Sequence, residues 1–202
     1  MPDNHYFSES ADAELKLKKF KVKLNGNKYE LVSSTGIFSP NELDTGTEVL
    51  LEQLDNLKPE GTILDIGCGW GPIALSIGLA SPKAKIIAID VNQKCIALTK
   101  INAESLGLVN IEVLTPDEIK DSIMFDEIWS NPPIRVGKKA LHDILLRWLP
   151  RLKPGGTARL VVQKNLGSDS LQKWLETEFS DGFEISRVAS VKGFRVLKVT
   201  RS

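Results

Sequence analysis

The residues with the clearest chemical potential form a run of alternating glycines, Gly67-Cys68-Gly69-Trp70-Gly71. The short apolar segment 63–66 precedes this run and is typical of a buried strand in a parallel sheet. Glycines let the backbone turn sharply and approach a ligand without Cβ obstruction, and Pro72 suits the start of a following helix. In doubly wound α/β sheets, such a strand, turn and helix form a nucleotide-binding edge. A tight turn without a ligand is the alternative for the glycines alone.

Asp65 stands two residues before the first glycine and helps to identify the nucleotide. The spacing G-x-G-x-G differs from the G-x-G-x-x-G of dinucleotide-binding proteins, which places a pyrophosphate at the helix N-terminus. A carboxylate repels phosphate but accepts hydrogen bonds from an ammonium or a hydroxyl. S-adenosylmethionine has no phosphate and carries an ammonium, so the pattern favours this ligand and disfavours a dehydrogenase.

A second acid, Asp90, ends the apolar segment 85–89, which predicts another buried strand. It follows the glycines by about twenty residues, where a ribose-binding carboxylate lies in this fold class. The alternative is that Asp90 caps a helix beginning near Asn92 or Gln93. Together with Asp65, it favours ligand binding.

A turn rich in proline, Asn131-Pro132-Pro133-Ile134, follows the predicted strand 125–130. Prolines are excluded from strand and helix interiors and lack an N–H donor. The turn therefore offers chiefly acceptors, the Asn131 side-chain oxygen and the Pro132 carbonyl. Two acceptors that hold the hydrogens of a conjugated amine would favour the pyramidal geometry in which its lone pair attacks a methyl group. A rigid turn without chemistry is the alternative.

With these motifs the chain resembles the small-domain class I methyltransferases, of which the 16S ribosomal RNA guanine-N2 methyltransferases are the best-defined members. The resemblance covers nearly the whole chain and includes the segments 4–8, 36–40, 43–47, 65–73, 89–92, 130–138, 154–156 and 193–196. Adenine-N6 and protein-glutamine relatives usually carry an aromatic residue after the prolines. Ile134 cannot stack on an acceptor in that way, which favours the guanine-N2 group.

The resemblance also implies which residues form the site. The expected catalytic residues are Asn131, Pro132, Pro133 and Ile134. The expected cofactor-binding residues are Gly46, Thr47, Asp65, Gly67, Cys68, Gly69, Gly71, Asp90, Val91, Asn92 and Asp117. The expected substrate-binding residues are Phe38, Arg135, Lys138 and Lys139, the basic ones as contacts to phosphates. No metal is expected. The structural alternatives are Thr45 or Thr47 as a helix cap, Asp117 as a turn residue after Pro116, and Cys68 as a small residue that fills space in the loop.

Composition predicts one globular domain spanning residues 1–202, with an N-terminal arm and hairpin in 1–33 and a Rossmann-like catalytic core in 34–202. The chain is 42% hydrophobic and carries 26 basic and 26 acidic residues. A pI of about 6.8 argues against indiscriminate binding to polyanions, so RNA recognition requires a local patch. We expect a cytoplasmic protein without membrane spans or signal peptide, favoured as a monomer, with Cys68 and Cys95 reduced.

The expected fold is α/β: a seven-stranded, mostly parallel sheet with helices on both faces and an N-terminal β-hairpin. Phe20, Val22 and Leu24 alternate with lysines ahead of the turn 25–27, which predicts the hairpin. Its lysine face is interpreted as solvated, with phosphate contact as the alternative. The segment 50–57 predicts a helix with leucines on one side, and Trp148 is expected in the core.

These features favour an S-adenosylmethionine-dependent methyltransferase acting on N2 of a guanine in ribosomal RNA or a ribosomal subunit. A protein-glutamine N5 or adenine-N6 methyltransferase would share residues 131–133 and stays open. So does a cofactor-binding module without catalysis, which assists RNA or a partner domain.

Overall fold

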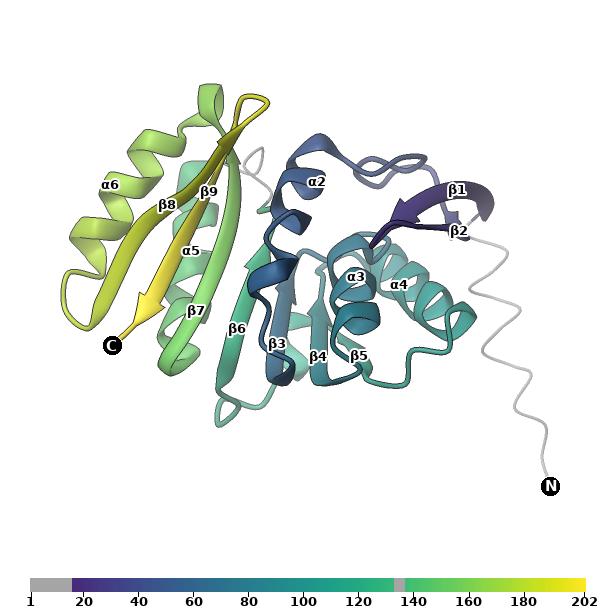
Figure 1. Ribbon diagram of the computed structural model, residues 1–202, viewed down its shortest axis with the longest axis horizontal. Helices are drawn as coiled ribbons and strands as arrows, with labels where there is room; N and C mark the ends of the chain where they lie inside the picture. The colour runs from purple at the N-terminus through teal and green to yellow at the C-terminus, as the bar shows by residue number, and fades with distance from the viewer. Residues whose placement is uncertain (1–15, 133–136) are drawn as a thin grey trace.

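The computed structural model describes residues 16–132 and 137–202, which form a seven-stranded mixed sheet and a separate two-stranded hairpin (Figure 1). The strands are β1 (Lys18–Leu24), β2 (Asn27–Ser33), β3 (Glu60–Ile66), β4 (Lys83–Ile89), β5 (Ile111–Leu114), β6 (Phe125–Ser130), β7 (Leu152–Gln163), β8 (Phe183–Val191) and β9 (Phe194–Arg201). The helices are α2 (Thr45–Leu51), α3 (Pro72–Ala80), α4 (Gln93–Ser105), α5 (Lys138–Trp148) and α6 (Ser168–Glu178). Short 3-10 turns occupy Leu54–Asn56, Pro116–Glu118, Leu149–Arg151 and Lys164–Leu166.

The strand order in the large sheet is β5-β4-β3-β6-β7-β9-β8. Strands β3 to β7 are parallel, whereas β9 pairs antiparallel with both β7 and β8. The chain builds outward from β3 to β5 and then returns to the other side of β3 with β6. This reversal creates a crevice between the carboxyl ends of β3 and β6, which is where open α/β sheets bind ligands. The expected fold class is confirmed.

Both faces of the sheet are covered by helices, as alternating strand residues require. Ile63 and Ile86 face a core cluster that includes residues of α2 and α3, whereas Leu64 and Ile87 face a cluster built on α5 and α6. Trp148 is buried in the second cluster, as predicted.

The hairpin of β1 and β2 packs against α3 and α4 beside the sheet (Figure 1). Asn25 and Gly26 both have positive φ, at 48° and 84°, as a two-residue turn of the favoured hairpin type requires. Phe20, Val22 and Leu24 are buried, and the intervening lysines are exposed. The predicted hairpin and its two faces are confirmed.

Two element boundaries differ from the predictions. Helix α2 ends at Leu51, and the leucine pattern continues only into the 3-10 turn Leu54–Asn56. Asp55 and Asn56 favour turns over helix interiors, and Pro59 disfavours helical backbone at the residue before it. The mostly apolar run 158–163 predicts a strand of that length, whereas β7 begins earlier, at Leu152. It includes Gly156, where a Cβ would lie 2.8 Å from the Lys153 carbonyl oxygen.

No helix within the described part of the chain has the length and apolarity needed to cross a membrane. The same residues contain no group of three or more His, Cys, Asp or Glu side chains arranged to hold a metal ion.

Candidate active site

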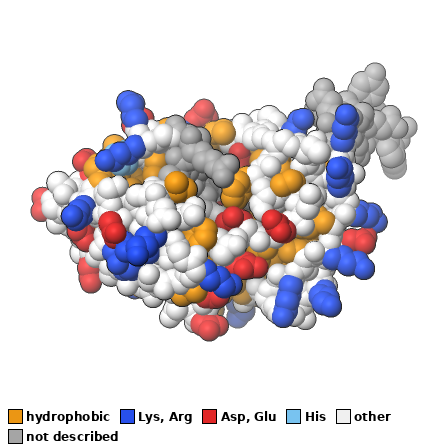
Figure 2. All heavy atoms as spheres, turned by 90° about the horizontal axis from the view of Figure 1, so that it is seen from above, with side chains coloured by type: hydrophobic (Ala, Val, Ile, Leu, Met, Phe, Trp, Pro, Cys, Tyr) orange, Lys and Arg blue, Asp and Glu red, His pale blue; other side chains and the backbone are white. Residues whose placement is uncertain are grey.

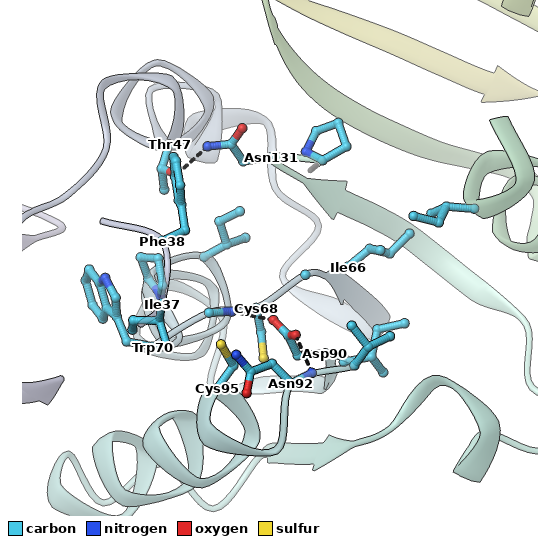
Figure 3. A pocket seen from close by; sticks show the side chains of 18 of the residues that line it. Ile37, Phe38, Thr47, Ile66, Cys68, Trp70, Asp90, Asn92, Cys95 and Asn131 are labelled. Carbon is cyan, nitrogen blue, oxygen red and sulfur yellow. Dashed lines mark hydrogen bonds between the residues drawn. The ribbon is translucent and has the colours of Figure 1, made fainter. Parts of the chain in front are cut away.

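A cavity of about 950 Å³ opens where the five parallel strands end (Figure 3). Ligand sites of small-molecule enzymes typically have about this volume or less. The predicted site residues that line it are Phe38, Thr47, Gly67, Cys68, Gly69, Asp90, Val91, Asn92, Asp117, Asn131 and Pro132. Gly46, Asp65, Gly71, Lys138 and Lys139 lie outside its wall, and Pro133, Ile134 and Arg135 lie outside the described residues. The cavity therefore brings together residues from both predicted motifs.

The glycine loop connects β3 to α3 through three residues in the left-handed region. Gly67, Gly69 and Gly71 have φ angles of 76°, 60° and 99°. A Cβ at Gly67 or Gly69 would meet no atom within 4 Å, so the space on the cavity side is free. A Cβ at Gly71 would lie 3.1 Å from the Thr99 methyl, so this glycine is needed for close packing against α4. Pro72 is the first residue of α3, as predicted.

Asp90 fastens this loop to the end of β4. Its Oδ2 accepts from the Gly69 N–H at 3.1 Å, and its Oδ1 accepts from the Asn92 N–H at 2.9 Å (Figure 3). The cap of α4 is Asn92, whose side chain accepts from the Lys94 N–H. Asp90 is therefore not the side chain that caps α4. It lies on the cavity wall beside exposed Val91.

Asp65 is buried behind the glycine loop. Its Oδ2 accepts from the Ala74 N–H at 3.0 Å in the first turn of α3, and its buried Oδ1 has no hydrogen-bond partner among the described residues. Burial raises the pKa of Asp65 to about 8, and the nearby Asp90 charge adds to the rise. An acid with a raised pKa and an unused oxygen beside a ligand cavity is typical of a functional site.

Both cysteines are buried free thiols. Burial raises the pKa of Cys68 well above its ordinary value and raises that of Cys95 to about 12. Because the thiolate is the nucleophilic form, neither residue is suited to nucleophilic catalysis at neutral pH. This agrees with the interpretation of Cys68 as a small residue within the glycine loop.

The turn after β6 places Asn131 and Pro132 on the cavity wall, next to the end of β3. The Ser130 hydroxyl donates to the Ile66 carbonyl at 2.8 Å, which joins the ends of these neighbouring strands. The Asn131 Nδ2 donates to Asp44 Oδ2 at 2.9 Å and to Thr47 Oγ1 at 3.0 Å (Figure 3 shows the second bond). Asp44 also caps α2, and neither of these contacts to Asn131 was expected from the sequence.

The sequence also did not indicate the contacts of Trp70, which lies between the hairpin and the glycine loop. Trp70 is buried, packs edge-on against Phe20 at 5.1 Å between ring centroids, and donates through Nε1 to the Ser39 carbonyl at 3.1 Å. This contact holds the loop after β2 across the cavity, where Phe38 is 59% exposed. Residue 70 carries no special pattern in the sequence beyond its place in the glycine run.

The wall opposite the glycine loop comes from α5 and the ends of β7 and β9. It is formed by Asp143, Ile144, Arg147, Trp148, Gln163, Leu166 and Phe194.

Asp117, expected near an adenine, has an 89% exposed side chain and accepts from Arg147 Nη1 at 2.9 Å. Lys139 pairs with Asp143 one turn along α5, and the His142 ring stacks on Trp174 at 3.6 Å between ring centroids.

The fold and the site define the class of protein. A glycine loop after the first parallel strand, an acid after the second and an Asn-Pro turn after the fourth make this an α/β methyltransferase of the Rossmann-like type. Residues 28–198 match the family model described as "Methyltransferase small domain". The chain belongs to this family.

Relatives within and around the family include both uncharacterized and named proteins. The chain is 34% identical to the uncharacterized protein YbxB of Bacillus subtilis, over 98% of both chains. It is 32% identical to ribosomal RNA small subunit methyltransferase C of Pseudomonas entomophila, covering 96% of this chain and 57% of that relative. The T. thermophilus 16S rRNA N2 methyltransferase RsmC, solved with AdoMet and guanosine, superimposes with a TM-score of 0.77 at 24% identity. That match covers 92% of this chain and 51% of the other, so this chain spans about half the length of these rRNA methyltransferases.

The methyl donor of this family is S-adenosylmethionine, and the residues present fit it. The cavity has the required volume, and the left-handed glycines leave free space beside the backbone. Asp90 lies on the cavity wall, where it can accept from hydroxyl groups, and the unpartnered Oδ1 of Asp65 is an acceptor whose ionised form a bound ammonium would stabilise. Gly67, Gly69 and Asp90 are the residues that would hold the donor.

Proposed function

We propose that this chain transfers a methyl group from S-adenosylmethionine to the exocyclic N2 amine of a guanine in ribosomal RNA. The observation that carries the proposal is the position of Asn131 and Pro132 in the same cavity as the glycine loop, on the neighbouring strand end. The names of the rRNA methyltransferase C relatives, and the guanosine in the RsmC complex, support guanine as the acceptor.

The chain's contribution to catalysis is positioning. S-adenosylmethionine supplies an electrophilic methyl group on a positively charged sulfur. The Asn131 side chain and the Pro132 carbonyl hold the hydrogens of the acceptor amine, so that its lone pair is directed away from them. The amine nitrogen forms a bond to the methyl carbon while the carbon–sulfur bond breaks and its electron pair stays on sulfur. The nitrogen then loses one proton to water.

Water is the expected proton acceptor because the carboxylates on the cavity wall are engaged. Asp44 and Asp90 accept backbone N–H bonds, Asp117 pairs with Arg147, and Asp143 pairs with Lys139. The positive charge that develops on the methylated nitrogen makes a strong base unnecessary.

The direct test supplies the purified chain with a tritiated methyl donor and four acceptors: undermethylated small ribosomal subunits, naked ribosomal RNA, DNA and a release-factor protein. We expect label in N2-methylguanosine on digestion of the RNA. Asn131→Ala should lower turnover by on the order of 100-fold with the donor affinity retained, because only the acceptor loses its contact. Label in N6-methyladenine or methylated glutamine would contradict the guanine assignment.

A further inference from the structure

Asp44 uses one oxygen to organise three groups at the acceptor side of the cavity. Its Oδ2 accepts from the Gly46 N–H at 2.9 Å, the Thr47 N–H at 3.2 Å and the Asn131 Nδ2 at 2.9 Å. The first two bonds cap α2, whereas the third reaches a residue 87 positions away in the sequence, directly after β6. Capping a helix requires only the first two hydrogen bonds, so the bond to Asn131 has another role.

The effect of this bond is to fix the orientation of the Asn131 amide. The Nδ2 group has two hydrogens, and Asp44 and Thr47 Oγ1 take both. Rotating the amide by half a turn would place Oδ1 against the carboxylate oxygen, and two acceptors would then face each other without a hydrogen between them. An ionised carboxylate can only accept, so the orientation follows from its chemistry. The polar atom that Asn131 has left for a ligand is an acceptor.

The backbone at Gly46 is built around the same contact. A Cβ at this position would lie 2.9 Å from Asp44 Oδ2 and 2.9 Å from Phe194 Cε1. A side chain there would push the carboxylate away from Asn131. Gly46 therefore supports the acceptor side of the site, in addition to the cofactor contact predicted for it.

We propose that Asp44 is a positioning residue that sets the hydrogen-bonding polarity of the acceptor site through Asn131. The site then accepts and does not donate, so it selects an amine and rejects a carbonyl at the same ring position. Guanine and xanthine differ in this way at C2. An acceptor that faces a carbonyl oxygen has no hydrogen to bind, so the site strongly disfavours a base with a carbonyl at this position. The inference rests on the proposed function and names the residue that enforces its choice of acceptor.

The first experiment compares Asp44→Ser with Asp44→Asn. Serine is an equally good helix cap but is too short to reach Asn131, whereas asparagine keeps both a cap and an acceptor oxygen. We expect Asp44→Ser to lower kcat for guanine-containing RNA by on the order of 10- to 100-fold, with donor affinity and melting temperature near wild type. Asp44→Asn should restore most of the activity. Competition by RNA with xanthine at the target should become more effective in Asp44→Ser, because the free amide can turn its N–H toward a carbonyl.

The second experiment does not depend on any acceptor. In a ¹⁵N-edited NMR spectrum of the protein with the donor bound, the two Asn131 side-chain amide protons should exchange slowly with solvent. Asp44→Ser should accelerate that exchange, and Asp44→Asn should not. Equal exchange in all three proteins, or an Asp44→Ser enzyme with unchanged kcat and unchanged discrimination, would overturn the proposal. If wild type methylates no guanine but the exchange pattern holds, the proposed function fails while the role of Asp44 stands.

Discussion

Individual side chains divide into those whose role follows from local sequence and those that need the fold. Asp90 comes at the end of an apolar strand, so its place at the sheet edge is predictable from the strand alone. Asp44 looks like an ordinary helix cap in the sequence, and its third hydrogen bond exists only because β6 returns beside β3. Arg147 meets Asp117 for the same reason, across 30 positions of sequence. Contacts of this kind have no local signal.

Asp65 gives a prediction at the same scale, because its charge is buried. Folding raises its pKa from 3.8 to about 8, chiefly through desolvation. Below about pH 4 the Asp65 carboxyl is protonated in both the folded and the unfolded protein, so it does not change the free energy of unfolding. Between about pH 4 and pH 8 the carboxyl loses its proton in the unfolded protein only. Stability should therefore fall as pH rises across that window and level off above it. Asp65→Asn keeps an acceptor for the Ala74 N–H and removes the charge, so it should match wild type near pH 4 and exceed it near pH 8.

The size of this effect has an upper bound of about 6 kcal/mol, from about 1.4 kcal/mol for each unit of pKa change between 3.8 and about 8. Urea unfolding of both proteins at several pH values measures it, because other titrating groups cancel in the difference. A difference that stays constant with pH would show that the Asp65 charge is not destabilised by folding. An acid kept at such a cost fits a role in holding a cationic ligand.

Among the elements, the glycine loop was predicted well because its signal is contiguous: an apolar strand, left-handed glycines and a proline at the helix start. The end of α2 was predicted poorly because leucine periodicity continues past it. The apolar pattern there reflects Leu54 and Leu57, which are partly buried and pack against the core although the helix has ended. Periodicity thus identifies the buried face more reliably than it identifies where a helix ends.

The glycines of this loop should not be equivalent, which leads to a matched pair of substitutions. Gly71→Ala puts an alanine in the left-handed conformation and its Cβ 3.1 Å from the Thr99 methyl, whereas the Cβ of Gly67→Ala meets no neighbouring atom. The left-handed conformation destabilises each variant by about 1–2 kcal/mol, and only Gly71→Ala adds a steric clash. We expect thermal unfolding to show the larger loss for Gly71→Ala. Calorimetry should show the larger loss of donor affinity for Gly67→Ala, because Gly67 lies on the cavity wall and Gly71 does not. Equal effects on both quantities would contradict the division between packing and ligand space.

The formal net charge of the whole molecule is zero, but lysines are concentrated on one face of the hairpin. Lys19, Lys21 and Lys23 are exposed on the outer face of the hairpin, where Lys23 faces Lys28 and Glu30 is the acidic residue of β2 that pairs with Lys19. Figure 2 looks onto the end of the sheet where the parallel strands end and shows lysine and arginine side chains along the hairpin side as well as on the opposite side of the molecule. Trp70 ties this hairpin to the wall of the cavity, so the lysine face has a fixed position relative to the acceptor site.

An RNA acceptor should therefore contact this face through its phosphates, although a solvated face was the expected interpretation of the lysines. Replacing Lys19, Lys21 and Lys23 with glutamine should weaken binding of single-stranded RNA about tenfold at moderate salt. It should also reduce the slope of log affinity against log salt by about 2, since each lost contact to a single strand removes about 0.7.

The matched control replaces three exposed lysines elsewhere, Lys83, Lys120 and Lys173, which removes the same charge from the molecule. Filter binding across a salt series separates the two explanations: equal losses in both triple variants would mean that net charge alone attracts the RNA, whereas a loss confined to the hairpin variant requires a local contact. Donor affinity should be unchanged in both, because the lysines lie outside the cavity wall.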